Sequence, residues 1–371
     1  MRRKVCHLTT VHPVFDTRIF FKEGVSLTKD YDVFLIAPHS KNETISSIHI
    51  RCLPKWESRF LRILLKGPIL FLKALRINAA LYHFHDPELM PYGLLLALMG
   101  KKVIYDIHEH VAEDLKQKKW LPAKGIFSNL HSYFENLTLK KCDIILANAF
   151  YAGIYENRMN RFAIVQNFAW PQLFHFKTNR DWESADRILL VGALSAARGL
   201  PVLIEALFLL KQEGISVTLQ CVGNKSESVH YILQHSHFYP EVRQQLLFDG
   251  YKPVSSAYED TEKCFAGAAL LERLENNKYN YPTKLFEYMA VGLPVIVSDY
   301  NINVAVLDRH NCGVIANPDD AKSVAAAIRQ LYLNKGQAKA MGKAGAIAAE
   351  KSYSWKSEEK KLLDFYGEVL R

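Results

Sequence analysis

The chain has 371 residues, of which 49% are hydrophobic and 23% charged, and this is the composition of a globular protein long enough for two domains of ordinary size. Its six cysteines are scattered without a C-x-x-C pair or a Cys/His group at metal-ligand spacing, which argues for a reducing compartment and against a structural zinc. The basic start (MRRKVCHLTT) lacks the apolar core of a signal peptide, and no run of about 18 apolar residues predicts a membrane span, so a cytoplasmic location is expected.

The net charge of +9 is concentrated in the first half of the chain. Residues 1–175 hold 24 Lys and Arg against 15 Asp and Glu, whereas residues 176–371 hold 23 of each kind. An anionic partner is therefore expected for the first half. A phospholipid surface, a lipid diphosphate and a nucleic acid all have the required charge, and composition does not choose among them.

Strands and helices alternate along the first half. Apolar runs typical of buried parallel strands lie at residues 4–10, 31–37, 102–105, 143–147 and 163–167, and residues 81–88 have the pattern of a strand end followed by a polar turn. Helices are predicted at residues 18–27, 90–99 and 127–140. This alternation predicts a parallel sheet, in which ligands bind at the carboxyl ends of the strands.

Residues 56–77 form a basic amphipathic pattern. At about 100° per residue the cations fall within one sector of a helical wheel, and apolar side chains occupy most of the rest. These cations are Arg59, Arg62, Lys66, Lys73 and Arg76. Such a helix suits an anionic bilayer surface, and the alternative is a packed helix with a solvated basic edge. Gly67-Pro68 interrupts the pattern, so one continuous register is not assured.

The loop after the first strand, HPVFDTRI, places three polar side chains at the expected ligand edge: His12, Asp16 and Arg18. The alternative is a loop that is braced by an Asp–Arg ion pair. The strand at residues 102–105 likewise runs into a polar edge, YDIHEH, which contains His108.

His83, His85 and Asp86 form a further polar group after a strand. Imidazole and carboxylate are zinc ligands, but no third cluster is placed to complete a coordination shell. The H-E-H at residues 108–110 also lacks the one-turn spacing of zinc-protease histidines. No metal site is therefore predicted.

The second half repeats the alternation after residues 171–186, which have no clear period and are expected to be an inter-domain linker. Strands are predicted at residues 187–191, 217–222, 247–251, 268–271, 295–297 and 313–316, and helices at residues 200–212, 284–290, 322–333, 338–350 and 354–370. Two strands end in glycine turns, one at Gly223 and one at residues 192–199 (GALSAARG). Small residues let a phosphate approach the backbone, and Arg198 would supply positive charge.

The strongest local signal is residues 281–299, YPTKLFEYMAVGLPVIVSD. Pro282 and Thr283 stand where a helix begins, Gly292 ends it, and a short buried strand follows. The N–H groups and dipole of such a helix start favour an anion, and the carboxylate of Glu287 lies one turn inside. We interpret the stretch as a site for the diphosphate and ribose of a nucleotide sugar; the alternative is an ordinary helix–strand unit. Together the two halves predict two doubly wound, Rossmann-like α/β domains facing each other across a cleft.

The sequence resembles a family-4-like glycosyltransferase of the GT-B fold over essentially its whole length. The segments that carry the resemblance are FDTRIFFKE, HDPEL, YDIHEH, VGALSAARGL, YPTKLFEYMAVGLPVIVSD and NCGVIANPDD. The closing YSWKSEEKKLLDFY is similar to the tail helix that crosses back onto the first domain in that family. The resemblance implies an acceptor-side domain at residues 1–170, the linker at 171–186, a nucleotide-sugar domain at 187–352 and the tail helix at 353–371.

The resemblance implies transfer of a sugar from a nucleotide diphosphate-sugar, with a UDP-sugar as the expected donor, to a lipid-linked or polysaccharide acceptor. Retention of configuration is expected, without a metal or other cofactor. Polysaccharide biosynthesis in bacteria would place such an enzyme on the cytoplasmic face of the plasma membrane, and the basic first half suits an anionic membrane surface rather than a nucleic acid. The alternatives are a GT-B-fold sugar-nucleotide epimerase and a non-catalytic nucleotide-sugar-binding subunit.

The matching motifs also imply roles for individual residues. Glu287 would hold the ribose hydroxyls, and Arg198 and Lys284 would neutralise the diphosphate leaving group. His108 would lie beside the transferred sugar, and Asp16 is the candidate general base if configuration inverts. The donor-binding set is completed by Gly223, Thr283 and Leu285.

Two positions depart from the family pattern. Tyr279 stands where the family often has a Glu that contacts the transferred sugar, and Ala193 stands where it often has an Arg. One carboxylate near the sugar and one cation near the diphosphate are therefore missing. We interpret Tyr279 as a change in sugar selectivity rather than a loss of activity.

Overall fold

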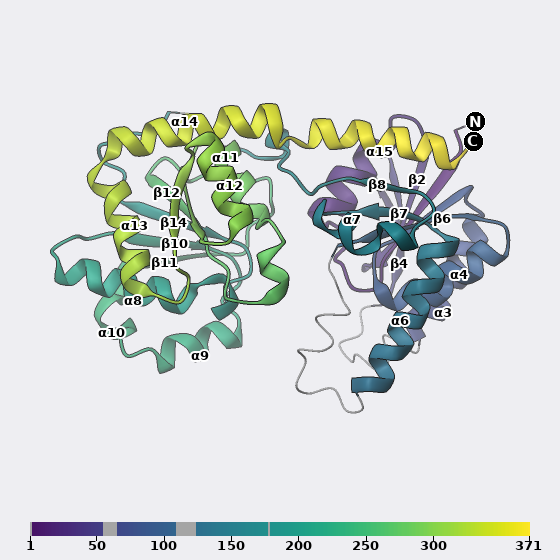
Figure 1. Cartoon of the computed structure of the whole chain (residues 1–371), viewed down its shortest axis with the longest axis horizontal. Coiled ribbons are helices and arrows are strands. Elements are labelled where there is room, and N and C mark those ends of the chain that lie inside the picture. Colours follow the sequence, from purple (N-terminus) through teal and green to yellow (C-terminus); the bar gives the residue numbers. More distant parts are fainter. Residues whose placement is uncertain (1, 55–64, 109–123, 177–178) are drawn as a thin grey trace. The chain divides into compact units, whose positions relative to one another are not determined.

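The computed structural model describes residues 2–54, 65–108, 124–176 and 179–371. The chain divides into two compact units, Met1–Asn167 with Trp355–Arg371, and Phe168–Ser354. Each unit is a predominantly parallel sheet covered by helices (Figure 1), so the predicted α/β fold with two Rossmann-like domains is confirmed. Residues 171–186, expected to be a linker, belong to the second unit. Within the described residues, no helix has the length and apolar character needed to cross a membrane.

The first sheet has the strand order β3-β4-β2-β1-β5-β6-β7-β8 and is parallel except for the pair β3–β4. Its strands are β1 (Lys4–Leu8), β2 (Asp32–Pro38), β3 (Glu43–Ile45), β4 (Ile48–Leu53), β5 (Leu81–Phe84), β6 (Lys102–Ile107), β7 (Asp143–Leu146) and β8 (Phe162–Ile164). The edge hairpin β3–β4 is not among the predicted strands, because its residues alternate in polarity and lack a continuous apolar run. In the centre of the sheet β1 and β5 pair His7 with His83.

The helices of the first unit form the layers on this sheet. They are the π-helix η1 (Thr17–Gly24), α1 (Val25–Leu27), α3 (Gly67–Ile77), η3 (Pro87–Leu89), α4 (Met90–Leu98), α6 (Lys124–Lys141), α7 (Phe150–Tyr155), η4 (Glu156–Arg158) and α15 (Trp355–Val369). The C-terminal helix α15 lies along this unit (Figure 1). Trp355 at its start is fully buried, and the indole N–H donates to Ser26 Oγ at 3.0 Å.

The basic helix predicted at residues 56–77 is corrected by the structure. Helix α3 begins only at Gly67, with Pro68 in its first turn, and residues 55–64 lie outside the described residues. Lys66 was expected on the basic outer face, but it is 3% exposed and its Nζ lies 3.5 Å from Thr10 O. Leu65 and Lys66 are themselves helical, in a π-helical turn ahead of α3, so the helix continues through Gly67-Pro68 and only the expected exposure of Lys66 is wrong.

The second sheet has the order β11-β10-β9-β12-β13-β14 and is parallel throughout. Its strands are β9 (Arg187–Val191), β10 (Thr218–Val222), β11 (Leu246–Gly250), β12 (Cys264–Ala269), β13 (Val295–Ser298) and β14 (Gly313–Ala316). Strand β12 begins earlier than the predicted strand at residues 268–271. Its small residues leave room for the ring of Tyr288 to pack against the strand. A Cβ on Gly267 would lie 2.4 Å from the ring of Tyr288.

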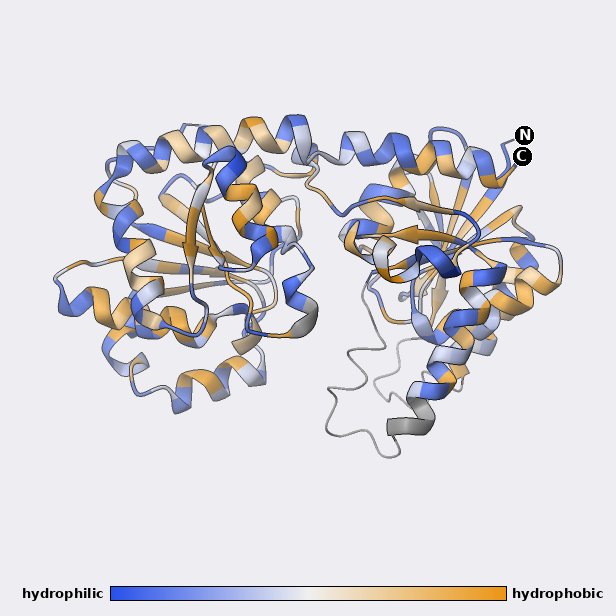
Figure 2. Cartoon of the chain, viewed as in Figure 1, coloured by the Kyte–Doolittle hydropathy of each residue, from blue (hydrophilic) through white to orange (hydrophobic). Residues whose placement is uncertain are grey.

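The helices of the second unit pack on both faces of this sheet. They are η5 (Pro171–Leu173), η6 (Ala196–Arg198), α8 (Leu200–Gln212), α9 (Glu227–His235), α10 (Tyr239–Val242), η7 (Arg243–Gln245), η8 (Glu275–Lys278), α11 (Thr283–Ala290), α12 (Asn301–His310), α13 (Ala321–Leu333) and α14 (Lys335–Ser352). Figure 2 shows apolar strands inside each unit and polar residues on the outward sides of the helices. Helices α9 and α12 are absent from the sequence prediction, and of the two only α12 lacks a strong apolar stripe.

Candidate functional site

A buried ion pair lies on α11, which follows β12 at the carboxyl edge of the second sheet. Glu287 is 5% exposed, and the Nζ of Lys284 lies 2.5 Å from its Oε2. The hydroxyl of Tyr258 donates to the same oxygen and lies 3.4 Å from Lys284 Nζ. Burial, followed by the charge of Glu287, raises the pKa of Tyr258, so this phenol stays protonated as a donor. The carboxylate is thereby fixed by two donors.

The first turn of α11 is held by packing and by one bond to the sheet. Leu285 is fully buried, and its N–H donates to Pro282 O at 2.9 Å. This N–H is therefore used within the turn, and Leu285 contributes mainly by anchoring the helix. Tyr288 accepts the Val191 N–H at 2.9 Å, which ties α11 to the end of β9. Thr283 is the first residue of the helix, as predicted.

Two glycine turns at the ends of β9 and β10 contact each other beside this pair. The Gly192 N–H donates to Val222 O at 2.9 Å, and a Cβ on Gly223 would lie 2.0 Å from Gly192 O. Gly192 has a φ of +117°, and the Cε of Lys284 lies 3.4 Å from the place of its missing Cβ. Lys284 therefore reaches over the turn after β9. Three positions predicted for the donor site, Gly223, Lys284 and Glu287, are brought together here.

Arg198 lies at the same edge but outside the ion-paired cluster. It ends the turn η6 and is partly buried, and Gly199 after it has a φ of +76°. Tyr279, which precedes α11, is 41% exposed.

Gly223→Ala is expected to destabilise the second unit by about 3 kcal/mol, because the new Cβ meets a backbone oxygen that cannot rotate away. A urea titration measures the free energy of unfolding. Gly336→Ala is the matched control in the same unit, since a Cβ there meets nothing within 4 Å. Equal stabilities of the two variants would show that the turns at Gly192 and Gly223 are not in contact.

In the first unit, Asp16 caps the π-helix η1. Its Oδ1 accepts the N–H groups of Arg18 at 2.8 Å and Ile19 at 2.9 Å, and its Oδ2 lies 3.5 Å from His12 Nδ1. Although burial alone raises it, the hydrogen bonds from His12 and the Ile19 N–H lower the pKa of Asp16 below its ordinary value. A carboxylate that is hard to protonate is a weak general base, so this geometry favours a capping role for Asp16 over the predicted catalytic one.

Asp106 on β6 joins Arg18 to His108. The guanidinium of Arg18 binds it in a bidentate manner, with Nε 2.8 Å from Oδ2 and Nη2 3.0 Å from Oδ1. The Nε2 of His108 lies 2.8 Å from the same Oδ2. Burial raises the pKa of Asp106, but Arg18 and then His108 lower it well below its ordinary value, so Asp106 is an anion. It therefore accepts the His108 Nε2–H and leaves Nδ1 of that ring as an acceptor.

The carboxylate of Asp86 holds the loop after β1 in place by accepting several hydrogen bonds. Its Oδ2 accepts the Thr10 N–H at 2.5 Å and the Thr9 hydroxyl at 2.9 Å, and the carboxylate is 2% exposed. These bonds hold the loop after β1 against the turn after β5. His12 lies between the two loops, with Nε2 3.5 Å from Asp86 Oδ1, and its ring centroid is 5.3 Å from that of His108. The His-rich and acidic strand ends thus meet at one edge of the first sheet.

Sequence reasoning missed Tyr258 and the role of Asp106. Tyr258 lies in the segment SSAYED, which has no motif, and only the fold brings it to Glu287. Asp106 stands in the motif YDIHEH, where the alternation of a strand would have indicated that Asp106 and His108 share one side.

Comparisons with known proteins extend this description. Residues 174–347 match the family model of "Glycosyl transferases group 1". The amylovoran biosynthesis glycosyltransferase AmsK of Erwinia amylovora is 28% identical over 172 residues, which are 45% of this chain and 40% of AmsK. The chain therefore aligns with less than half of the length of this relative.

Solved structures resemble the whole chain. Sucrose-phosphate synthase from Thermosynechococcus elongatus superposes with a TM-score of 0.77 at 14% identity, covering 99% of each chain. HepE of Anabaena in complex with UDP and glucose superposes with a TM-score of 0.74 at 12% identity, covering 99% of this chain and 100% of HepE. At such identities the likeness shows the fold. The chain therefore has the GT-B fold, and its residues 174–347 match the family model of glycosyl transferases group 1.

Proposed function

We propose that the chain is a glycosyltransferase that moves a sugar from a nucleotide diphosphate-sugar to a lipid-linked or polysaccharide acceptor. The observation that carries the proposal is the Lys284–Glu287 pair, held by Tyr258 inside the region that matches the family model. The solved structures of HepE, of the same fold, contain UDP, UDP with glucose, and UDP-glucose, which supports a UDP-sugar as donor.

The donor would be held by the second unit. The Glu287 carboxylate would accept hydrogen bonds from the ribose hydroxyls, and Lys284 places a cation over the glycine turn after β9. Arg198 and the N–H groups at the start of α11 add positive potential for the diphosphate. Together these groups stabilise the charge that develops on the leaving diphosphate without requiring a metal ion.

The first unit would bind the acceptor and would contact the sugar that is transferred. His108 presents a ring whose Nε2 is committed to Asp106, so its Nδ1 can accept a hydrogen bond from a sugar hydroxyl. Because Asp16 is a capping carboxylate with a lowered pKa, it is a poor base for inversion. We therefore propose transfer with retention, in which the leaving diphosphate itself assists the attacking hydroxyl on the same face.

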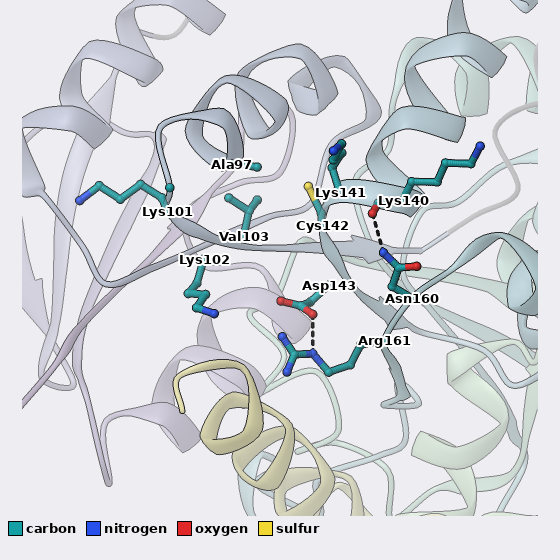
Figure 3. A pocket seen from close by; sticks show the side chains of 11 residues that line it. Ala97, Lys101, Lys102, Val103, Lys140, Lys141, Cys142, Asp143, Asn160 and Arg161 are labelled. Carbon is teal, nitrogen blue, oxygen red and sulfur yellow. Dashed lines mark hydrogen bonds and ion pairs between the residues drawn. The ribbon is translucent and has the colours of Figure 1, made fainter.

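An apolar–basic surface on the first unit supports a membrane-bound acceptor. Leu98 and Met99 at the end of α4 are 76% and 56% exposed. Beside them is a shallow pocket of about 530 Å³, shown in Figure 3. Its basic lining residues are Lys101, Lys102, Lys140, Lys141 and Arg161. Exposed apolar side chains among lysines suit the headgroup region of an anionic bilayer. We propose peripheral binding through this surface.

The double variant Leu98→Ser, Met99→Ser is expected to bind phosphatidylglycerol-containing vesicles about tenfold more weakly, because it removes the apolar part of the surface. Vesicle co-sedimentation measures the partition coefficient. Leu333→Ser is the control, since Leu333 is also exposed but lies in the second unit. Equal binding by the two variants would contradict the proposed surface.

Release of nucleoside diphosphate from a panel of nucleotide sugars tests the transfer. With an acceptor extract, we expect release that continues unchanged during brief chelator treatment. Conversion of the donor sugar without any acceptor would instead indicate an epimerase. Donor binding without turnover over a broad acceptor panel would indicate a non-catalytic subunit.

A further inference from the structure

Three histidines and one glutamate converge inside the first unit. His7 comes from β1, His83 from β5, His85 from the residue after it, and Glu23 from the π-helix η1. Their exposed fractions are 1% for His7, 0% for His83, 2% for His85 and 0% for Glu23. One ligand atom from each lies within 4.8 Å of the others. His83 and His85 are close together in the sequence, whereas His7 and Glu23 join them from distant segments.

The distances fit a four-coordinate cation. Glu23 Oε2 lies 3.9 Å from His7 Nδ1 and 4.0 Å from His85 Nε2. His7 Nδ1 and His85 Nε2 are 2.9 Å apart. With bonds of about 2.0–2.1 Å, neighbouring ligand atoms of a tetrahedral zinc stand about 3.3 Å apart. The observed distances between ligand atoms are partly shorter and partly longer than about 3.3 Å. Small rotations of the side chains would therefore bring the ligand atoms to tetrahedral positions.

The outer hydrogen bonds direct ligand nitrogens into the cluster. His85 Nδ1 lies 3.3 Å from Asp106 Oδ2, which favours the tautomer whose Nε2 lone pair faces Glu23. The Tyr366 hydroxyl lies 3.5 Å from His7 Nε2 and 2.7 Å from His83 Nδ1, so His83 would bind a cation through its Nε2. Carboxylates and hydroxyls behind histidine ligands are the usual outer partners of a zinc site.

Without a cation, the cluster leaves polar groups unsatisfied. The Nε2 of His83 and both oxygens of Glu23 have no hydrogen bond among the described residues, although Glu23 Oε1 lies 2.9 Å from Arg18 Nε. Arg18 is also the bidentate partner of Asp106. Two fully buried carboxylates thus share one guanidinium, and an uncompensated buried charge is costly. A divalent cation would satisfy the histidines and the charge together.

We propose that His7, Glu23, His83 and His85 bind a structural zinc ion in the first unit. Three imidazoles and one carboxylate in a closed shell are a zinc donor set, and four protein ligands leave no open position for catalysis. Because the ligands are buried, the ion is taken up during folding and is retained afterwards. The site is separate from the donor-binding residues of the second unit, and the inference does not depend on the proposed transfer.

Metal analysis of untagged full-length protein, grown with added zinc and purified without chelator, tests the site. We expect close to one zinc per chain by plasma mass spectrometry. Glu23→Gln and His83→Gln are expected to lose the metal and to unfold at lower temperature. His49→Gln is the control, because His49 pairs with Asp32 at the edge of the same sheet and lies outside the cluster. Cobalt-grown protein should show the visible absorption of a tetrahedral ion.

The metal-free alternative gives the opposite results. If the cluster binds no metal, wild type and cluster variants contain the same background of zinc, and cobalt-grown protein lacks the absorption of a tetrahedral ion. Absence of zinc and cobalt in the wild type would overturn the proposal, as would metal that remains in both cluster variants. If a cluster variant fails to fold, the metal content and cobalt spectrum of the wild type decide the question.

Discussion

Glu287→Gln is expected to lower kcat/KM for the nucleotide-sugar donor at least about 100-fold. The substitution keeps the side-chain shape but removes the charge that faces Lys284, and it replaces one of the two oxygens that could accept from ribose hydroxyls with an NH2 donor. Hydrogen bonds to a charged group contribute about 1.5–3 kcal/mol each, and two of them correspond to at least two orders of magnitude.

The control for this variant is Glu213→Gln. Glu213 also pairs with a cation, Arg329, at 2.6 Å, but the pair is exposed and lies outside the cluster. Donor turnover is measured for both variants after circular dichroism has shown that they are folded. If Glu287→Gln turned over the donor as fast as Glu213→Gln does, the main support for the donor site would be lost.

Asp106→Asn is expected to cost about 3–5 kcal/mol of folding free energy and most of the transfer activity. The substitution leaves the buried guanidinium of Arg18 without its bidentate partner, and breaking one side of a buried pair has this magnitude. It also removes the carboxylate that sets the tautomer of His108. Asp143→Asn is the control, because Asp143 pairs with Arg161 on the same sheet at a partly exposed site and should cost less than about 1 kcal/mol.

The pH dependence of unfolding gives an independent check. Because the folded pKa of Asp106 lies below its unfolded value of about 3.9, its stabilisation is complete above about pH 5 and is lost as the pH falls further. The stability gap between wild type and Asp106→Asn should therefore narrow below pH 5 and stay constant between about pH 5 and 7. A gap that widens on acidification would contradict the assignment of Asp106 as the anion.

The parts of the fold that could be predicted are those encoded locally. Buried parallel strands are continuous apolar runs, and the start of α11 is marked by Pro282 and Thr283, so both are visible in the sequence. Three of the donor positions meet as expected because they follow strands or begin a helix at one sheet edge. Edge elements such as β3 and β4 were missed because they bury only part of their surface.

What could not be predicted depends on contacts between distant segments. Tyr258 reaches Glu287 from a loop without a motif, and Glu23 meets three histidines only after η1 has packed on β1 and β5. Asp16 has the residue type of a base, but its use as a helix cap appears only when the turn of η1 is known. Lys66 shows the same limit, because its burial near Thr10 O depends on a contact between distant segments.

The central claim is that Glu287 binds the ribose of a nucleoside diphosphate. Calorimetric titration of UDP and 2′,3′-dideoxy-UDP into wild type and Glu287→Gln tests it most directly. We expect UDP to bind the wild type at least about tenfold more tightly than the dideoxy compound, and the two to bind Glu287→Gln alike. The same preference for UDP in both proteins, or no binding of UDP to the wild type, would contradict the account.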